Sequence, residues 1–175
     1  MLKEKINKAF NAQVTKEIYS AYLYFSMCAF FDNINLKGFS NWMRVQAQEE
    51  LFHANKFFSF VLERGGKIEL EAIDKPPVSW KTALDVFESA YKHELFVSAS
   101  INDLVALALE EKDFAAHSFL QWFVNEQVEE EAAADEIVQK LKLLGEDKGA
   151  GIFMMNNELG ARVFTPPATG ADAAN

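Results

Sequence analysis

Apolar residues recur every three or four positions along four long segments of the chain, residues 4–33, 38–65, 82–111 and 115–144. This spacing keeps apolar side chains on one face of an α-helix, which has about 3.6 residues per turn. In the first segment the apolar face is formed by Phe10, Val14, Ala21, Tyr24, Cys28 and Phe31. We therefore predict four amphipathic helices that pack around a shared core.

Each of the four apolar faces is interrupted by residues of the types that bind metal ions. These residues are Glu17 in the first segment, Glu50 and His53 in the second, Glu94 in the third and Glu130 in the fourth. They stand within the apolar stripes, where a core-facing helix normally has apolar side chains. The pattern indicates a metal site inside the predicted bundle.

The predicted turns set the height of these residues along the bundle. Glu17 lies 18 residues before Asn35, in the middle of the first turn, and His53 lies 18 residues after it. Glu94 and Glu130 lie at similar distances on either side of the turn between the last two helices. Antiparallel partners at equal distance from their turn meet at equal height. We therefore expect all the ligands near the middle of the bundle.

Residues 66–81 connect the second and third predicted helices and contain Pro76-Pro77, which cannot continue a helix. A helix over 38–65 is about 42 Å long at ~1.5 Å per residue. The connection can extend to about 50 Å at ~3.3 Å per residue, so it can return along the whole bundle. The predicted fold is all-α, a four-helix bundle with one long crossover between parallel second and third helices. A short fifth helix is expected at 151–164.

Residues 1–164 are predicted to form one domain, followed by a flexible tail at 165–175. A chain of 175 residues with 50% hydrophobic content can bury a substantial single core.

The net charge of −9 argues against a nucleic-acid partner, because phosphates require basic surface. A single cysteine, Cys28, excludes an internal disulfide and favours a reducing compartment. No segment has the roughly 20 apolar residues of a membrane span. We expect a soluble, cytoplasmic protein with no membrane partner.

A single Glu-x-x-His motif is a weak signal in a chain with 26 acidic residues, and on its own it would be interpreted as a surface pair or a histidine with satisfied hydrogen bonds. The joint placement of the four glutamates changes this interpretation. Burying an unpaired carboxylate costs several kcal/mol, and four would exceed a typical domain stability of about 5–15 kcal/mol. No lysine or arginine interrupts the stripes near that height. Bound cations would offset the charge.

Four carboxylates and one imidazole carry a charge near −4, which two divalent ions would balance if one glutamate bridged them. Oxygen donors suit iron and manganese and favour the ferric over the ferrous ion. Zinc has no redox role and prefers fewer ligands with more nitrogen or sulfur. We therefore predict a dinuclear iron site at which Fe(II) is oxidised.

Longer stretches around the ligands extend this pattern. They are QEELFHANKF around Glu50 and His53, HEL at Glu94, and LQWFVNEQVEEE at residues 120–131, with Tyr24 following Glu17. Over nearly the whole chain these segments resemble the non-haem bacterial ferritins, di-iron carboxylate proteins with a ferritin-like fold. The resemblance implies a ferroxidase that oxidises Fe(II) with O2 or H2O2 and stores ferric mineral inside a homo-oligomeric shell of 24 subunits.

The resemblance also implies the roles of individual residues. Glu17, Glu50 and His53 would hold one iron, and Glu50 would bridge to a second iron held by Glu94 and Glu130. A third iron position beside the pair would use three more carboxylates, Glu49, Glu126 and Glu129. Helix geometry alone leaves open that Glu49 and Glu129 are solvated surface charges.

Tyr24 lies two turns after Glu17 on the same stripe. Because long helical side chains point toward the N-terminus, its hydroxyl is expected to reach the carboxylates. The resemblance implies that Tyr24 supplies an electron to the irons; the alternative is a core tyrosine with a buried hydrogen bond. Gln127 is expected to hydrogen-bond to ligands at the second iron. Trp122 is expected to be a packing residue.

Haem-binding relatives differ at two places. They carry a second Glu-x-x-His on the fourth helix, where this chain has Gln127 and Glu130, and a haem-ligating methionine where this chain has Leu51. We therefore expect no haem. His93 and His117 fall off the ligand face and are expected at the surface.

Two alternatives remain open from the sequence. A rubrerythrin-like di-iron peroxidase or oxidase usually has more ligating histidines and a cysteine-rich module, whereas this chain has one histidine on its stripes and one cysteine. A metal-free helical interaction protein would fit the long helices but not four coincident glutamates.

Overall fold

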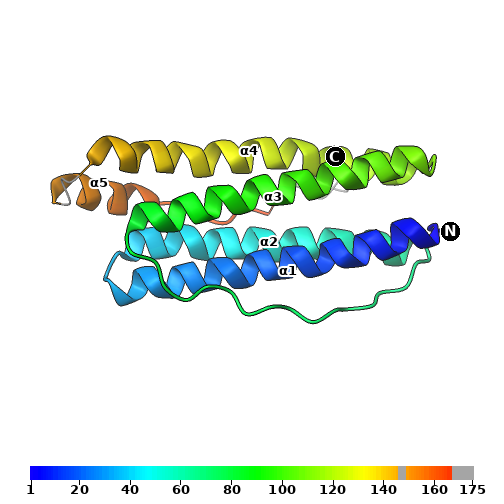
Figure 1. Cartoon of the computed structure of the whole chain (residues 1–175), viewed down its shortest axis with the longest axis horizontal. Coiled ribbons are helices and arrows are strands. Elements are labelled where there is room, and N and C mark those ends of the chain that lie inside the picture. The colour runs from blue at the N-terminus through cyan, green and yellow to red at the C-terminus, as the bar shows by residue number, and fades with distance from the viewer. Residues whose placement is uncertain (146–148, 167–175) are drawn as a thin grey trace, which may run out of the picture.

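The computed structural model describes residues 1–145 and 149–166, and within these ranges it consists of helices and connecting segments. The four long helices are α1 (Glu4–Asn33), α2 (Lys37–Glu63), α3 (Ala83–Glu110) and α4 (Phe114–Leu144), and the short α5 is Ala150–Leu159. The long helices lie side by side as a bundle, with α5 at one end (Figure 1). The predicted all-α fold with four long helices and a short fifth is confirmed.

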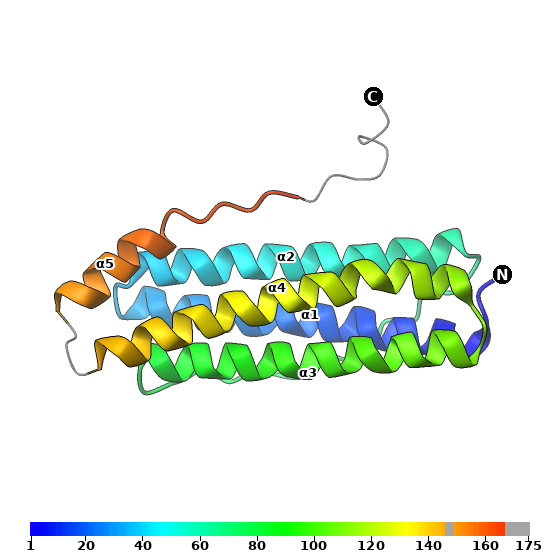
Figure 2. The ribbon, with the colours of Figure 1, turned by 90° about the horizontal axis from the view of Figure 1, so that it is seen from above.

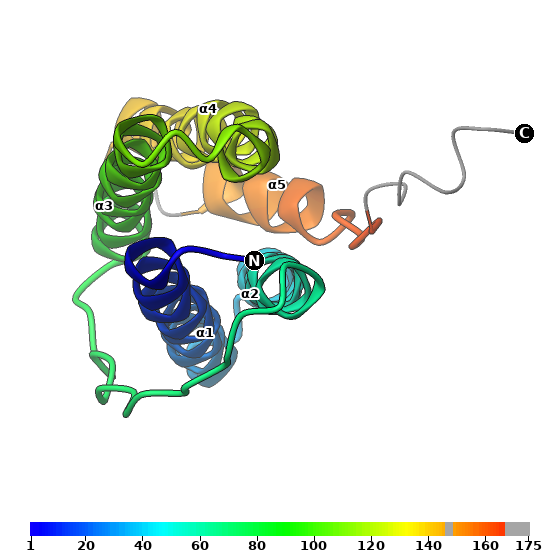
Figure 3. The same cartoon turned by 90° about the vertical axis from the view of Figure 1, so that its right-hand side faces the viewer.

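The long crossover is also confirmed. The connection between α2 and α3 runs back along the outside of the bundle beside α1, so that α2 and α3 point the same way (Figures 1 and 3). Side chains of α1 fix its course. Asn7 Oδ1 accepts a hydrogen bond from the Lys67 backbone at 2.9 Å, and Asn11 Oδ1 accepts one from the Glu69 backbone at 2.7 Å. Farther along, Ser26 donates to the Pro77 carbonyl.

The turns and caps follow from local chemistry. Asn35 sits in the α1–α2 turn with a φ of 58°, a left-handed conformation that asparagine tolerates better than most residues. Thr82 caps α3 by accepting from the Asp85 backbone at 3.1 Å. Asp113 caps α4 and also pairs with both terminal nitrogens of Arg64, at 3.1 and 3.0 Å. This fork ties the end of α2 to the start of α4.

The hydrophobic core is divided into two clusters. The cluster nearer the α1–α2 turn includes Phe31, Phe39 and Phe87, and the cluster at the opposite end includes Phe10 and Phe57. Between them lies a layer of buried polar side chains, consisting mainly of Glu17, Gln46, Glu50, His53, Glu94, Gln127 and Glu130. The apolar clusters keep water from both ends of this layer, which is the mid-bundle position predicted for the ligands.

The end of the fifth helix was predicted wrongly. The helix begins at Ala150 and stops at Leu159, not at residue 164. Beyond it, Asn41 Nδ2 of α2 lies within hydrogen-bond distance of the carbonyls of Leu159, Gly160 and Arg162, at 3.4, 3.4 and 2.9 Å. The Asn41 side chain thus provides hydrogen bonds to the segment that follows α5 and holds that segment beside α2. The predicted domain boundary remains a prediction, and the predicted flexible tail falls largely on residues 167–175, outside the described residues.

Within residues 1–145 and 149–166, no helix combines the length and the apolar character that crossing a bilayer requires.

Candidate dinuclear metal site

Each of the four long helices delivers ligand-type side chains to the polar layer. Glu17 comes from α1, Glu50 and His53 from α2, Glu94 from α3 and Glu130 from α4, and their exposed fractions lie between 1% and 6%. Such burial is unusual for glutamate without a compensating partner. The prediction that these five residues interrupt the apolar stripes on the buried side is therefore confirmed by their burial. Their role as ligands remains a prediction.

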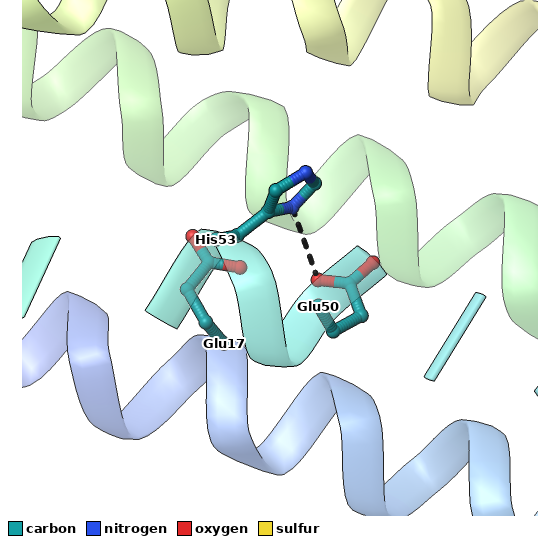
Figure 4. A group of neighbouring side chains, drawn as sticks. All are labelled: Glu17, Glu50 and His53. Atoms are coloured by element: carbon teal, nitrogen blue, oxygen red, sulfur yellow. Dashed lines mark ion pairs between the residues drawn. The ribbon is translucent and has the colours of Figure 1, made fainter. Parts of the chain in front are cut away.

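Glu17, Glu50 and His53 form the first group that fits a metal ion. One ligand atom from each lies within 4.8 Å of the other two, and His53 Nδ1 is 3.6 Å from Glu50 Oε2 (Figure 4). Oε2 of Glu17 is buried and has no hydrogen-bond partner among residues 1–145 and 149–166. A buried carboxylate oxygen without a partner is costly, and a cation among these three side chains would satisfy it.

His53 also belongs to a second group, with Glu126 and Glu130, whose ligand atoms meet the same 4.8 Å limit. His53 Nε2 is 3.9 Å from Glu126 Oε1, while Nδ1 faces Glu50. The imidazole thus has a carboxylate near each nitrogen. When a metal-binding histidine uses one nitrogen as ligand, a carboxylate near the other commonly fixes its orientation.

Glu94 belongs to neither group among the described residues and is held by hydrogen bonds instead. The Tyr24 hydroxyl donates to Glu94 Oε1, and Gln127 Nε2 donates to Glu94 Oε2 at 3.3 Å. The expectation that the Tyr24 hydroxyl reaches a carboxylate is confirmed, as is the hydrogen bond from Gln127. Both residues lie against a predicted ligand of the second iron.

Burial strongly perturbs the acidity of this layer. It raises the pKa of Glu17 and of Glu130 to about 8, and it raises the pKa of Glu50 and of Glu94 well above the usual value. The neighbouring carboxylates add to these shifts because ionising one makes ionising the next harder. At neutral pH the metal-free layer therefore retains protons that a bound cation would displace.

The three carboxylates predicted for a third iron position have different surroundings. Glu126 is partly buried beside His53, Glu49 forms an ion pair with Arg162, and Glu129 is exposed. Among the described residues, only Glu126 of the three joins a group with metal-sized spacing. The third position remains a prediction.

Two residues important to the site were missed from the sequence. Gln46 is completely buried and donates to Glu50 Oε1 at 3.2 Å and to Glu130 Oε2 at 2.5 Å. Arg162 donates to Gln46 Oε1 at 2.9 Å, which places a cation next to the polar layer. Gln46 stands on the apolar stripe one turn before Glu50, and that signal could have identified it. Arg162 lies outside the four stripes, so periodicity could not.

His93, expected at the surface, is partly exposed and also packs against neighbouring side chains. Its Nε2 lies 2.7 Å from Ser20 Oγ of α1, and its ring packs near those of Tyr19 and Phe96. Burial lowers the pKa of His93 to about 4. The crossover covers this side of the bundle, because Ala72 to Asp74 line the same pocket as His93. His117 is partly exposed.

Comparison with known proteins agrees with this geometry. The family model for the ferritin-like domain matches residues 7–144, which is most of the chain and nearly all of the four long helices. The chain belongs to the ferritin family. It is 43% identical to a bacterial non-heme ferritin of Bacteroides fragilis over 93% of this chain and all of that protein. It is 41% identical to a bacterial non-heme ferritin of Campylobacter jejuni, over 88% of this chain and 92% of that one.

Solved structures give the same result. An open pore ferritin from the hyperthermophilic archaeon Archaeoglobus fulgidus superposes with a TM-score of 0.92 at 55% identity, covering 93% of this chain and all of that one. A humanized archaeal ferritin superposes with a TM-score of 0.93 at 56% identity, covering 95% and 100%. The resemblance inferred from the sequence motifs is confirmed.

Proposed function

We propose that this ferritin oxidises Fe(II) to Fe(III) with O2 or H2O2 at the buried polar layer and stores the ferric product inside a homo-oligomeric shell. Membership of the ferritin family supports iron storage. The observation that carries the oxidation site is the group formed by Glu17, Glu50 and His53, in which a buried glutamate oxygen has no hydrogen-bond partner in the described part of the chain. An iron ion bound there as substrate would satisfy it.

In this proposal Glu17, Glu50 and His53 bind one Fe(II), and Glu50 bridges to a second Fe(II) bound by Glu94 and Glu130. Each pair of Fe(II) ions supplies two electrons, enough to reduce O2 to H2O2 or H2O2 to water. Oxygen ligands favour Fe(III) over Fe(II), which adds driving force to the oxidation. The apolar clusters on both sides exclude water from the layer and strengthen its electrostatic interactions.

The protons held by the glutamates leave when Fe(II) binds. The pKa values of about 8 for Glu17 and Glu130 mean that both side chains carry a proton for most of the time at neutral pH. Binding of a divalent ion stabilises the carboxylate form and releases those protons. The site then carries the negative charge that two Fe(II) ions neutralise.

Tyr24 and Gln127 act on the Glu94 side of the site. The Tyr24 hydroxyl donates to Glu94, so a proton can pass to that carboxylate if Tyr24 gives up an electron. Gln127 holds the other oxygen of Glu94 and fixes the carboxylate plane. We assign Tyr24 the role of an auxiliary electron donor, and Gln127 that of a residue that orients Glu94.

The proposal also covers a third iron position and the assembly of the shell. Glu49, Glu126 and Glu129 form a third iron position, and 24 copies of the chain form the shell. Assembly is supported by the exposed apolar side chains of the single chain, among them Phe25, Phe96, Phe114 and Phe153. A cytoplasmic location and the absence of haem remain predictions from the sequence. The family match outweighs the rubrerythrin-like alternative.

Aerobic addition of Fe(II) to the metal-free protein tests the proposal. The absorbance of Fe(III) should rise quickly in the wild type, and many iron ions per chain should remain bound after desalting. Glu94→Ala and His53→Ala should each slow the fast phase at least about tenfold, because each removes a proposed ligand. Glu88→Ala, an exposed position on the same helix as Glu94, is the matched control. Wild-type rates in both site variants would overturn the assignment.

A further inference from the structure

The segment that follows α5 is anchored on α2. The backbone N–H of Gly38 donates to Asn156 Oδ1 at 2.8 Å, and Asn41 Nδ2 donates to the Arg162 carbonyl at 2.9 Å. The helices come close at Gly38, where an added Cβ would lie 1.6 Å from the Asn156 carbonyl oxygen. Figure 2 shows the segment leaving α5 and running along α2. Its position relative to α2 is therefore fixed at several points.

This anchoring carries the side chain of Arg162 to the edge of the polar layer. Its guanidinium carbon lies 4.4 Å from the centre of the Trp42 ring, a cation–π arrangement. One terminal nitrogen donates to Gln46 Oε1 at 2.9 Å. The other pairs with Glu49 Oε2. The fork of Arg162 thus holds two side chains that stand three positions apart on α2.

The contact with Gln46 sets which end of that amide faces the carboxylates. An amide has an acceptor oxygen on one side and a donor NH2 group on the other. Because the guanidinium only donates, it requires the oxygen of Gln46, and the NH2 group then points to Glu50 and Glu130. The reversed amide would place its NH2 group against the guanidinium and its oxygen against two carboxylates. The first contact would be repulsive, and the second would be repulsive once Glu50 and Glu130 are ionised, as they are when a cation binds.

The contact of Arg162 with Glu49 hinders cation binding at the third iron position, whereas its contact with Gln46 supports the dinuclear site. Glu49 is a proposed ligand there, and its oxygen is engaged by Arg162. A cation that uses Glu49 must compete with the guanidinium. If it succeeds, Arg162 loses one partner, and its hold on Gln46 weakens as well.

We propose that Arg162 is a positioning residue that favours iron at the dinuclear site, by orienting Gln46 toward Glu50 and Glu130, and disfavours iron at the third position, by occupying Glu49. The proposal rests on the proposed function, because both positions belong to it. Occupancy of the third position then weakens the dinuclear site and, by linkage, the reverse holds. Arg162 is the residue that couples them.

The simplest competing explanation is that Arg162 only fastens the C-terminal segment. Loss of a fastening residue would loosen the structure and weaken both metal positions together. Loss of a coupling residue would instead weaken metal binding at the dinuclear site and strengthen it at the third position. The direction of the two affinity changes therefore distinguishes the explanations.

The test is an anaerobic titration of the metal-free, assembled protein with Co(II), followed by calorimetry and visible absorbance. In Arg162→Gln, the dinuclear site should bind Co(II) about tenfold more weakly, the usual cost of losing a partner behind a ligand. The third position should bind a few fold more tightly, as expected from freeing a partly exposed carboxylate from an ion pair. Introducing Glu49→Gln into the wild type or into Arg162→Gln should abolish Co(II) binding at the third position, which identifies the signal that belongs to that position.

Two further variants sharpen the result. Arg162→Lys keeps the charge but presents one nitrogen in place of a fork, so it should keep Glu49 engaged while the dinuclear affinity still falls. Arg44→Gln is the matched control, because Arg44 lies on the exposed side of α2 and contacts Asp32 instead of the polar layer. Its Co(II) affinities should equal those of the wild type. Circular dichroism and native mass establish that each variant is folded and assembled.

Opposite changes in Arg162→Gln, with Arg44→Gln unchanged, would support the proposal. Equal weakening of both positions would overturn it in favour of a fastening role, and unchanged affinities would overturn it outright. If the wild type itself binds no Co(II) that depends on Glu17 and His53, the proposed function fails and this proposal with it. That outcome differs from the others because it appears before any change at Arg162.

Discussion

At the scale of single residues, the decisive feature is the burial of four glutamates at one level of the bundle. Their positions could be predicted from the sequence because a charged glutamate is unexpected among the apolar residues on the core-facing side of a helix. Gln46 is less conspicuous at such a position, since its amide is neutral. The role of Arg162 could not be predicted, because it depends on how a segment without periodicity returns to α2.

The raised pKa of Glu17 predicts how the stability of the metal-free protein depends on pH. Its folded pKa is about 8, against an ordinary value of 4.5. Between these values the folded state keeps a proton that the unfolded chain releases. The contribution of Glu17 to stability is therefore greatest below about pH 4.5 and falls as pH rises toward 8. The loss attributable to Glu17 is on the order of 3–5 kcal/mol.

Glu17→Gln should remove the share of this pH dependence that Glu17 contributes, since glutamine is neutral throughout, while Glu130 keeps its own share. Thermal unfolding of the metal-free wild type and variant, followed at several pH values from 5 to 8, measures the difference. The melting temperature should fall with pH more steeply in the wild type. Parallel curves would show that Glu17 does not carry the raised pKa.

Proton release on metal binding is a second consequence of the same burial. At pH 7, anaerobic binding of Co(II) should release at least about one proton per ion, because Glu17 and Glu130 are then mostly protonated. Calorimetry in buffers with different ionisation enthalpies measures the number directly. Release should decline as pH rises past 8. A release that does not vary between pH 6 and pH 9 would contradict the assigned pKa values.

At the scale of elements, the four long helices follow closely from hydrophobic periodicity, and their ends from glycine, proline and capping residues. The α2–α3 crossover was predictable because its length and its two prolines leave few other paths. The end of α5 was not, because the contacts that replace its helical hydrogen bonds come from Asn41, far away in the sequence.

The docking of α5 depends on Gly38, and this can be tested by substitution. Gly38→Ala should detach α5 from α2, because the new Cβ would clash with the Asn156 backbone. Limited proteolysis should then cut the C-terminal segment faster, while the helical content of the four-helix bundle stays unchanged. Gly160→Ala provides a graded control, since its Cβ would lie 3.2 Å from the same carbonyl oxygen. Equal protease resistance in wild type and Gly38→Ala would contradict this role.

At the scale of the whole molecule, a polar layer divides the hydrophobic core into two clusters. The layer adds little hydrophobic stabilisation of its own, so the helices are held by packing on either side of it. Cations bound in the layer should stabilise the fold, because they bind the folded state and not the unfolded chain. In the proposed function, the middle of the bundle is less stable without metal, and bound cations complete the site.

Assembly is the other property of the whole molecule. Native mass measurement of the purified protein should give a complex of 24 chains, each of 19.8 kDa. Phe153→Glu, which places a charge on the exposed face of α5, tests whether that face joins subunits. A stable monomer of the wild-type protein at micromolar concentration would contradict storage inside a shell.

We propose above all that five side chains, Glu17, Glu50, His53, Glu94 and Glu130, together hold two iron ions. Anomalous diffraction at the iron edge, from crystals soaked anaerobically in Fe(II), locates those ions. Two strong peaks are expected inside each chain, one bounded by Glu17, Glu50 and His53 and the other by Glu50, Glu94 and Glu130. Iron found only at the protein surface, with these five side chains free of it, would show that the dinuclear site does not exist.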